Sequence, residues 1–388
     1  MRVAYVCADA GVPVFGCKGC SIHVQEMLRA MIGRGFNIEL FATRVDGNCP
    51  EGLESVRVHR LPRLRANREA ATTRQVEQEN QARREMIEDA QPFDLVYERY
   101  SLWSFVGMEV AQHQSIPGIL EVNAPLIEEQ AAYRGLTNRH VAEGVARRAF
   151  KAASALVAVS PEVADYLSAW PETEGRTHVV SNGVNVSRFG PLRSETIRHT
   201  DDLTIGFVGT LKPWHGVQDL LNAFSRLLPR FPRLKLRIVG DGPERERLER
   251  QAREISTTSI TFAGAVTPAE IPAKLREMNI GVAPYPQMEP CYFSPLKLYE
   301  YAAAGLAIVS SNIGEPGRVI EHEVNGLLCR PSDPADLVRQ LERLIRHPQE
   351  RIALGRTAHR RVSQNHTWGH VLQRILKLST GRRWYSSD

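Results

Sequence analysis

The chain has 388 residues, which exceeds the usual size of one domain and predicts two domains of roughly 190 residues each. The hydrophobic fraction of 43% and the charged fraction of 24% are typical of a globular protein, and no apolar run approaches the roughly 18 residues of a membrane-spanning helix. The net charge of +5 is too small to indicate a nucleic-acid-binding protein, so we expect no nucleic-acid partner.

The N-terminal sequence MRVAYVCAD has one Arg and then a short β-rich run, which predicts a buried first strand rather than a signal peptide. We therefore expect a cytoplasmic protein whose six cysteines are reduced thiols. Cys17 and Cys20 have the spacing of a redox or zinc half-site, but no second Cys/His pair is evident in the sequence.

The first half begins in the order strand, loop, helix, strand. Residues 2–8 predict a strand, residues 11–21 a glycine-containing loop, and residues 37–42 a second strand. Between them, apolar residues recur at the spacing of an amphipathic helix packed on a sheet: Val24, Met27, Leu28, Met31 and Ile32. A βαβ unit of this kind joins parallel strands.

The same order restarts with a strand at 203–209, a loop at 210–216 and, after a helix, a strand at 234–240. Further short strands are expected at 94–99, 118–123, 155–160, 259–264, 280–285 and 306–311. The pattern predicts an α/β fold of two doubly wound, Rossmann-like domains, residues 1–188 and 200–365, that face an interdomain cleft where ligands bind. Residues 366–388 predict a terminal helix, and its return to the first domain is left open.

The segment 291–305 (CYFSPLKLYEYAAAG) combines a helix start with a cation and a carboxylate. Ser294 is expected to be the N-cap and Pro295 the first helical residue. The free N–H groups of a helix start attract phosphate, and Lys297 adds positive charge for an anionic partner. Glu300, one turn further, suits the ribose that follows a nucleotide diphosphate. From this segment alone, an ordinary capped helix with a surface Lys and Glu stays equally open.

The first loop of each half contains further candidates. The glycines of residues 16–24 (GCKGCSIHV) allow the backbone to approach a phosphate or a sugar closely. In the second loop, Lys212 and His215 could flank a diphosphate. A solvated Lys212 and a Trp214 that only packs are the alternatives.

Five arginines without an acidic residue among them form a basic segment: Arg57, Arg60, Arg63, Arg65 and Arg68. A solvated surface loop is the favoured interpretation. Contact with an anionic acceptor or with a membrane surface is the alternative.

Taken together, these segments resemble a known family. VGTLKPWHGVQDLLNAF, IVGDGPERERLE, FAGAV and YFSPLKLYEYAAAG are similar to the second domain of retaining glycosyltransferases of family 4, bacterial group 1 type, which have the GT-B fold. In the first half and at the end of the chain, KGCSIHVQEM, DLVYERYSL, LEVNAPL, VVSNGVNVSRF and HTW agree in order and spacing.

This resemblance implies transfer of a sugar from a nucleotide sugar to a hydroxyl acceptor, with retention of configuration and without a divalent metal or other cofactor. It places the ribose-binding carboxylate at Glu300, the base near Gly264 and Ala265, and the glycine-rich loop at Gly16 to Ser21. The donor-binding residues are then expected to be Gly16, Gly19, Ser21, His23, Lys212, His215, Gly264, Ala265, Tyr292, Phe293, Ser294, Pro295, Leu296 and Glu300. Lys297, Glu121 and Asn123 are expected to be catalytic: Lys297 stabilises the leaving diphosphate in a front-face displacement, and the other two orient the sugar or acceptor.

The sequence departs from the family pattern at several positions. Tyr292 stands where the family has the first Glu of its Glu-x7-Glu pattern, and Thr210 and His215 stand where Arg and Lys are usual. Glu121 and Asn123 occupy the loop that often offers a His. A sugar-nucleotide epimerase and a non-catalytic subunit that binds nucleotide sugars are therefore the alternatives. The acceptor is a sugar, a lipid-linked compound or a small molecule, with peripheral contact at the inner membrane face through Arg57–Arg68 as one option.

Overall fold

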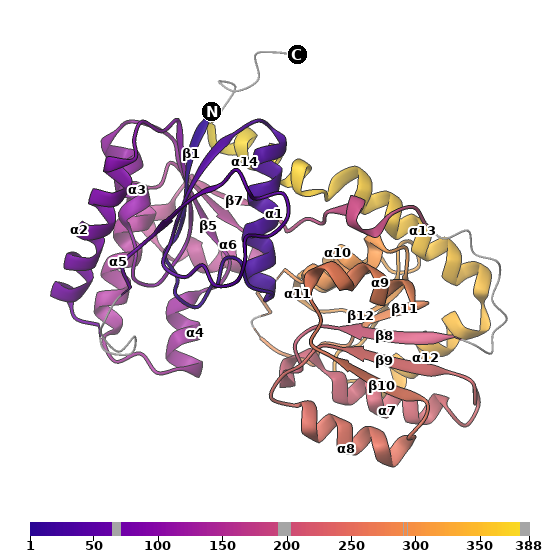
Figure 1. Cartoon of the computed structure of the whole chain (residues 1–388). Helices are drawn as coiled ribbons and strands as arrows, with labels where there is room; N and C mark the ends of the chain where they lie inside the picture. The colour runs from indigo at the N-terminus through magenta and orange to yellow at the C-terminus, as the bar shows by residue number, and fades with distance from the viewer. Residues whose placement is uncertain (64–70, 193–202, 290, 293, 381–388) are drawn as a thin grey trace. The chain divides into compact units, whose positions relative to one another are not determined.

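The computed structural model describes residues 1–63, 71–192, 203–289, 291–292 and 294–380. Contacts within the chain divide it into two units (Figure 1): Met1–Asn182 together with the last helix, and Gly183–Thr367. Each unit contains one parallel sheet with helices on both faces. The predicted α/β fold with two doubly wound sheets is confirmed. Residues 183–188, which we expected in the first domain, belong to the second unit, where the Val184 N–H donates to the His366 carbonyl over 2.8 Å.

In the first unit, the sheet has the strand order β3-β2-β1-β4-β5-β6-β7. The strands are β1 (Arg2–Cys7), β2 (Asn37–Ala42), β3 (Arg57–Arg60), β4 (Leu95–Arg99), β5 (Gly118–Val122), β6 (Ala155–Ala158) and β7 (Thr177–Val179). The helices are α1 (Gly19–Gly33), α2 (Thr73–Asp89), α3 (Val106–His113), α4 (Leu126–Tyr133), α5 (Arg139–Ala152), α6 (Pro161–Ser168) and α14 (Trp368–Thr380). Helices α1 and α14 pack together on one face, and α2, α3 and α5 on the other.

In the second unit, the strand order is β10-β9-β8-β11-β12-β13. The strands are β8 (Thr204–Val208), β9 (Lys235–Val239), β10 (Ile260–Gly264), β11 (Ile280–Ala283), β12 (Ala307–Ser311) and β13 (Leu327–Cys329). The helices are α7 (Val217–Leu227), α8 (Arg245–Ile255), α9 (Ile271–Arg276), α10 (Leu296–Ala303), α11 (Gly314–Val319), α12 (Pro334–Arg346) and α13 (Pro348–Asn365). Helices α7, α8 and α12 pack on one face of this sheet, and α10 and α13 on the other.

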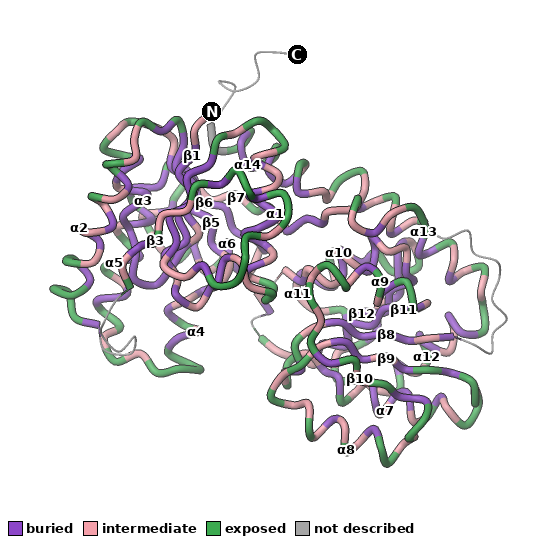
Figure 2. The backbone as a smooth tube through the Cα atoms, viewed as in Figure 1, coloured by how far each residue is buried: buried purple, intermediate pink, exposed green. Residues whose placement is uncertain are grey.

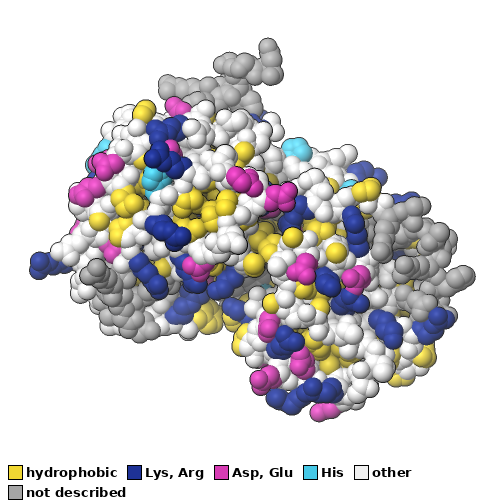
Figure 3. Space-filling view, viewed as in Figure 1, with side chains coloured by type: hydrophobic (Ala, Val, Ile, Leu, Met, Phe, Trp, Pro, Cys, Tyr) yellow, Lys and Arg dark blue, Asp and Glu magenta, His cyan; other side chains and the backbone are white. Residues whose placement is uncertain are grey.

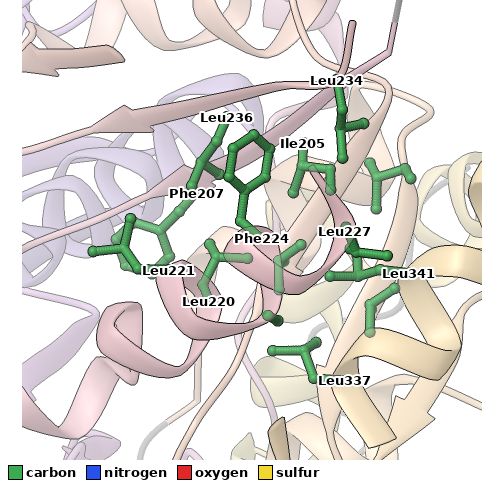
Figure 4. Close-up of a cluster of buried hydrophobic side chains, with 14 of the residues drawn as sticks. Ile205, Phe207, Leu220, Leu221, Phe224, Leu227, Leu234, Leu236, Leu337 and Leu341 are labelled. Atoms are coloured by element: carbon green, nitrogen blue, oxygen red, sulfur yellow. The ribbon is translucent and has the colours of Figure 1, made fainter. Parts of the chain in front are cut away.

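The central strands of both sheets are buried, and the outer faces of the helices are exposed (Figure 2). Figure 4 shows how the apolar stripe of α7 meets the strands: Leu220, Phe224 and Leu227 pack against side chains of β8, β9 and α12. Phe207 of β8 belongs to this cluster and is fully buried. The cluster therefore fixes Phe207, whose ring also contacts the candidate site.

Some predicted elements differ from the observed ones. Helix α10 begins at Leu296, with Pro295 rather than Ser294 at the N-cap position, so the predicted hydroxyl cap is wrong by one residue. Arg57–Arg60 form strand β3 rather than a loop, because this segment pairs with β2 at the edge of the sheet. The sequence reading missed β7 and β13, which have only three residues each. Arg65 and Arg68 lie outside the described residues.

On the visible face, positive and negative side chains lie close together over α8 (Figure 3), where Arg245 pairs with Asp241 and Glu249. Strand β3 is similarly balanced, because Glu39 contacts His59 at 2.5 Å and Arg57 at 3.9 Å. Within the described ranges, no helix combines the length and the apolar character needed to cross a membrane.

Candidate functional site

The carboxyl ends of the strands in the second sheet bring together three loops that are distant in sequence. The N–H of Gly209 donates to Val239 over 2.9 Å, and that of Leu211 donates to Asp241 over 2.9 Å. The N–H of Gly240 donates to Gly264 over 2.8 Å. These bonds fix the loops after β8, β9 and β10 at one edge of the sheet, where open α/β folds bind their ligands.

Two glycines in the first of these loops have backbone conformations that other residues rarely adopt. Gly209 has a φ of 146° and Gly216 a φ of 66°. A Cβ on Gly209 would lie 3.0 Å from Nζ of Lys297, and a Cβ on Gly216 would overlap the carbonyl oxygen of Pro284. The sequence VGTLKPWHG therefore folds so that bare backbone faces the lysine of α10.

Lys297 is the central cation of this edge. Its Nζ is buried and lies 4.2 Å from the ring centre of Phe207 and 5.3 Å from that of Tyr285. Among the described residues, Nζ has no hydrogen-bond partner. Burial lowers the pKa of Lys297 to about 7, against an opposing effect of Glu300. A buried ammonium without hydrogen bonds is costly, so this arrangement favours an anion that supplies the missing acceptors.

His215 lies beside this cation and is held in a defined tautomer. Its Nδ1 donates to the carbonyl of Thr210, which leaves Nε2 as an acceptor. Burial together with the charges of Lys297 and Lys212 lowers the pKa of His215 to about 3, so the ring is neutral at pH 7 in the unliganded protein. A neutral His215 adds no positive charge of its own beside Lys297, and its place next to a diphosphate stays a prediction. Nζ of Lys212 lies 4.6 Å from the ring centre of Trp214, which is 39% exposed.

The N-terminus of helix α10 lies at the same edge of the sheet. Leu296 and Lys297 are its first residues, and no acidic side chain occupies the first turn. The hydroxyl of Tyr301 accepts from the N–H of Val208 over 2.8 Å and so ties α10 to β8. Glu300, Tyr292 and Ser294 are partly exposed, and Pro295 is buried. Phe293 lies outside the described residues.

The predicted base-binding residues end strand β10. Gly264 is buried with a φ of 73°, and Ala265 is exposed. The carbonyl of Gly264 accepts from Gly240, so this turn is joined to the loop after β9.

In the first unit, a polar cluster lies where β1, β4 and β5 end. Nε2 of His23 lies 2.7 Å from Oε1 of Glu121, and Nη1 of Arg99 lies 3.8 Å from Oε2 of Glu121. Burial raises the pKa of Glu121, but His23 and Arg99 outweigh it and bring it below its ordinary value. Glu121 is therefore a buried carboxylate ion held by two neighbours.

Several polar atoms of this cluster are buried without a hydrogen bond within the described part of the chain. They are Nη1 of Arg99, Oδ1 of Asn123, Oγ of Ser21 and the hydroxyl of Tyr5, while the hydroxyl of Tyr97 interacts with Glu121. The two tyrosine rings stack with their centres 5.2 Å apart. Buried polar groups normally have partners, so this set indicates a place that water or a polar ligand occupies.

The loop before α1 is held by one side chain. Nε2 of Gln25 donates to the carbonyls of Val14 (2.8 Å) and Gly16 (2.9 Å). Gly19 is the first residue of α1. The ring of Trp368, at the start of α14, meets His23 edge-on with the ring centres 4.9 Å apart. The returning helix thus supports the histidine that contacts Glu121.

The predicted site residues therefore form two groups. Lys212, His215, Gly264 and Lys297 lie at one edge of the second sheet, and Ser21, His23, Glu121 and Asn123 lie in the polar cluster of the first unit. Sequence reasoning missed Phe207, Tyr285 and Arg99. Arg99 could have been found, because a charged residue that ends a buried strand (DLVYER) is unusual. The two aromatic residues gave no such signal, since aromatic side chains are common in buried strands.

The fold and these strand-end loops define a two-unit protein of the Rossmann-like class, and sequence comparison identifies its family. Residues 18–188 match the profile of glycosyltransferase family 4, and residues 202–347 match that of glycosyl transferases group 1. The chain belongs to the group 1 glycosyltransferases of the family 4 type, as the motifs predicted.

Individual relatives agree with this family. A glycogen synthase of Mycobacterium tuberculosis is 30% identical over 196 residues, a match that spans 50% of this chain and 45% of that relative. A D-inositol 3-phosphate glycosyltransferase of Salinispora tropica is 24% identical over 395 residues, covering 93% of this chain and 80% of the relative.

Solved structures share the fold. Sucrose-phosphate synthase from Thermosynechococcus elongatus has a TM-score of 0.74 at 19% identity, with 97% of this chain and 98% of that chain covered. HepE from Anabaena, solved in complex with UDP and glucose, has a TM-score of 0.71 at 20% identity, with 98% and 100% covered.

Proposed function

We propose that this protein is a retaining glycosyltransferase that takes a sugar from a nucleotide diphosphate donor and transfers it to a hydroxyl group without a divalent metal. The buried, unpartnered ammonium of Lys297 at the strand ends of the second unit is the observation that carries the proposal. A diphosphate would supply the acceptors that Nζ lacks, and would keep the lysine protonated.

The remaining residues of this edge receive roles around that contact. The start of α10 and Lys212 add positive charge, and Nε2 of His215 accepts a hydrogen bond from a hydroxyl of the donor rather than from the diphosphate. Glu300 binds the ribose hydroxyls, and the turn at Gly264 and Ala265 borders the base. HepE was solved with UDP and glucose, which makes UDP a sensible first probe.

The proposed chemistry is a front-face displacement. The bond between the anomeric carbon and the diphosphate oxygen breaks while the acceptor hydroxyl attacks from the same side, and the leaving diphosphate takes up the hydroxyl proton. Lys297 stabilises the charge that develops on this leaving group, which is the usual way in which a fixed cation lowers such a barrier. No protein nucleophile is needed.

We assign Glu121 and Asn123 the task of orienting the transferred sugar or the acceptor, together with Gly16, Gly19, Ser21 and His23. Their support is the set of buried polar atoms around Glu121, which requires hydroxyl-rich or water partners. Arg99 joins this group as a positioning residue, because its guanidinium lies 3.8 Å from Oε2 of Glu121 and lowers the pKa of that carboxyl.

Thermal shift with a panel of nucleotides and nucleotide sugars tests the donor site, since a ligand of the folded protein raises its Tm. Glu300→Ala should weaken binding by roughly 10- to 100-fold, as expected for a lost charged hydrogen bond of about 1.5–3 kcal/mol. Glu246→Ala, an exposed carboxylate of α8, is the matched control and should leave binding unchanged. Equal binding by wild type and Glu300→Ala would contradict the assignment.

Incubation of the bound donor with and without acceptors separates transfer from the alternatives. Isomerised sugar in the absence of acceptor would indicate an epimerase. Tight donor binding without hydrolysis or transfer would indicate a non-catalytic subunit, a reading favoured by Tyr292 in place of a carboxylate. The anomeric configuration of a transfer product, measured by NMR, decides between retention and inversion.

The acceptor could be presented at a membrane. Arg57, Arg60 and Arg63 are exposed, although Glu39 already contacts Arg57. Flotation with anionic vesicles should separate wild type from Arg60→Glu/Arg63→Glu, and equal flotation would remove the membrane contact from the proposal.

A further inference from the structure

Two thiols at the start of α1 are distinct from the other cysteines. Cys17 is exposed and Cys20 partly exposed, while Cys7, Cys291 and Cys329 are buried. Burial raises the pKa of Cys7 and of Cys329 to about 12, which keeps both in the unreactive thiol form. Cys49 is exposed but has no neighbouring cysteine in the sequence.

The backbone brings the two residues to the same end of one helix. The chain bends over residues 16–18, Lys18 is the N-cap of α1, and Cys20 is the second helical residue. Lys18 makes no side-chain cap, and the first turn contains no acidic residue. The free N–H groups of this turn therefore give the helix start next to both cysteines a partial positive charge.

A buried cation reinforces this environment. Burial lowers the pKa of the Arg99 guanidinium, but Glu121 and then Cys20 outweigh it and raise that pKa, so Arg99 and Cys20 interact electrostatically. Nη1 of Arg99 is buried and lacks a hydrogen bond among the described residues. Cationic neighbours of this kind are typical of thiols that exchange disulfides.

The surroundings favour redox chemistry over a metal. Within the described residues, no group of three or more His, Cys, Asp or Glu side chains could hold a metal ion. The pair has instead the features of an exchangeable dithiol: one exposed sulfur, a second sulfur three residues on, and a positive helix end.

We propose that Cys17 and Cys20 are a modification site that forms a reversible intramolecular disulfide by exchange with a small-molecule disulfide such as oxidised glutathione. The thiolate of Cys17 attacks one sulfur of glutathione disulfide and expels a glutathione thiolate. The thiolate of Cys20 then attacks the mixed disulfide and expels the second glutathione. Two protein thiols are oxidised, one glutathione disulfide is reduced, and the two protons pass to the released glutathione.

Peptide mapping tests this directly. Lys18 lies between the two cysteines, so trypsin separates residues 3–18 from residues 19–29 unless a disulfide joins them. After equilibration with glutathione disulfide and alkylation of free thiols, the joined pair should appear in wild type and in Cys49→Ser, and should be absent from Cys17→Ser. Fragmentation distinguishes Cys17 from Cys7, which shares its peptide. A Cys7–Cys20 link, or glutathione on each cysteine separately, would overturn the proposal.

The glutathione dependence provides a second measurement. At a fixed ratio of reduced to oxidised glutathione, a tenfold lower total concentration should raise the ratio of disulfide to dithiol about tenfold, because one protein disulfide releases two glutathiones. A mixed disulfide would show no such dependence, and its absence would refute the intramolecular bond. Neither measurement uses a nucleotide sugar, so both stand apart from the proposed transferase activity.

Discussion

The environment of Lys297 predicts that this residue takes up a proton when a diphosphate binds. With a pKa of about 7 in the free protein, the lysine is roughly half protonated at pH 7 and about nine-tenths neutral at pH 8. A bound diphosphate favours the ammonium and raises its pKa. Binding should therefore take up about half a proton at pH 7 and close to one at pH 8.

The size of the effect follows from the same pKa. Restoring the ammonium at pH 8 costs about 1.4 kcal/mol, so donor affinity should fall roughly tenfold between pH 7 and pH 8.5, with the steepest change above pH 7. Lys297→Met keeps an apolar stem between Phe207 and Tyr285 but removes the charge. Its affinity should be roughly 10- to 100-fold lower than that of wild type and independent of pH over this range.

Isothermal titration calorimetry in two buffers of different ionisation enthalpy counts the protons taken up on binding. UDP-glucose is a suitable ligand because its diphosphate has no proton to exchange near neutral pH. Lys235→Met, an exposed lysine at the start of β9, is the matched control. Tight binding at pH 8 without proton uptake, or the same pH profile in Lys297→Met, would refute the assigned role of Lys297.

Three further predictions concern stability and the site backbone. Gly216→Ala should lower both Tm and UDP affinity, because the new Cβ overlaps the Pro284 carbonyl; an unchanged Tm in a thermal melt would show that the loop adapts freely. Burial raises the pKa of Glu98 to about 7 from 4.5, although Ser104 donates to it over 2.9 Å. The folded protein therefore keeps this proton up to a higher pH than the unfolded chain does. The contribution of Glu98 to the free energy of unfolding is greatest below pH 4.5 and falls by about 3 kcal/mol up to pH 7. Urea unfolding at pH 5 and pH 8 should show most of that loss in wild type but less of it in Glu98→Gln, and identical pH dependence would contradict the buried carboxylic acid. Trp368→Ala should destabilise the protein by about 3–5 kcal/mol, as a large buried side chain is lost; a change below 1 kcal/mol by urea titration would show that the His23 contact contributes little.

The sequence predicted most of the fold because its buried strands are continuous apolar runs between turn residues. Strand β2 covers the predicted residues 37–42. Strand β3 was not predicted because its segment Arg57–Arg60 is basic and half exposed. Its place at the edge of the sheet depends on pairing with β2, which the local sequence pattern does not reveal.

The candidate site could be predicted only at residues whose type already indicates their chemistry. Lys297 stood out as a cation at a helix start, although the helix begins one residue later than predicted. That its ammonium lies between Phe207 and Tyr285 depends on how β8, β11 and α10 pack, since these residues are far apart along the chain. The neutral state of His215 likewise depends on burial and on two lysines that only the folded protein brings close.

The division of the chain affects the order in which the protein is made. Helix α14 completes the first unit, yet it is synthesised after the entire second unit. Its apolar residues Leu372 and Ile375 are almost fully covered in the finished protein. A nascent chain that has only its first 182 residues outside the ribosome therefore exposes the surface that α14 will cover, and the first unit stays incomplete until residues 368–380 have been synthesised.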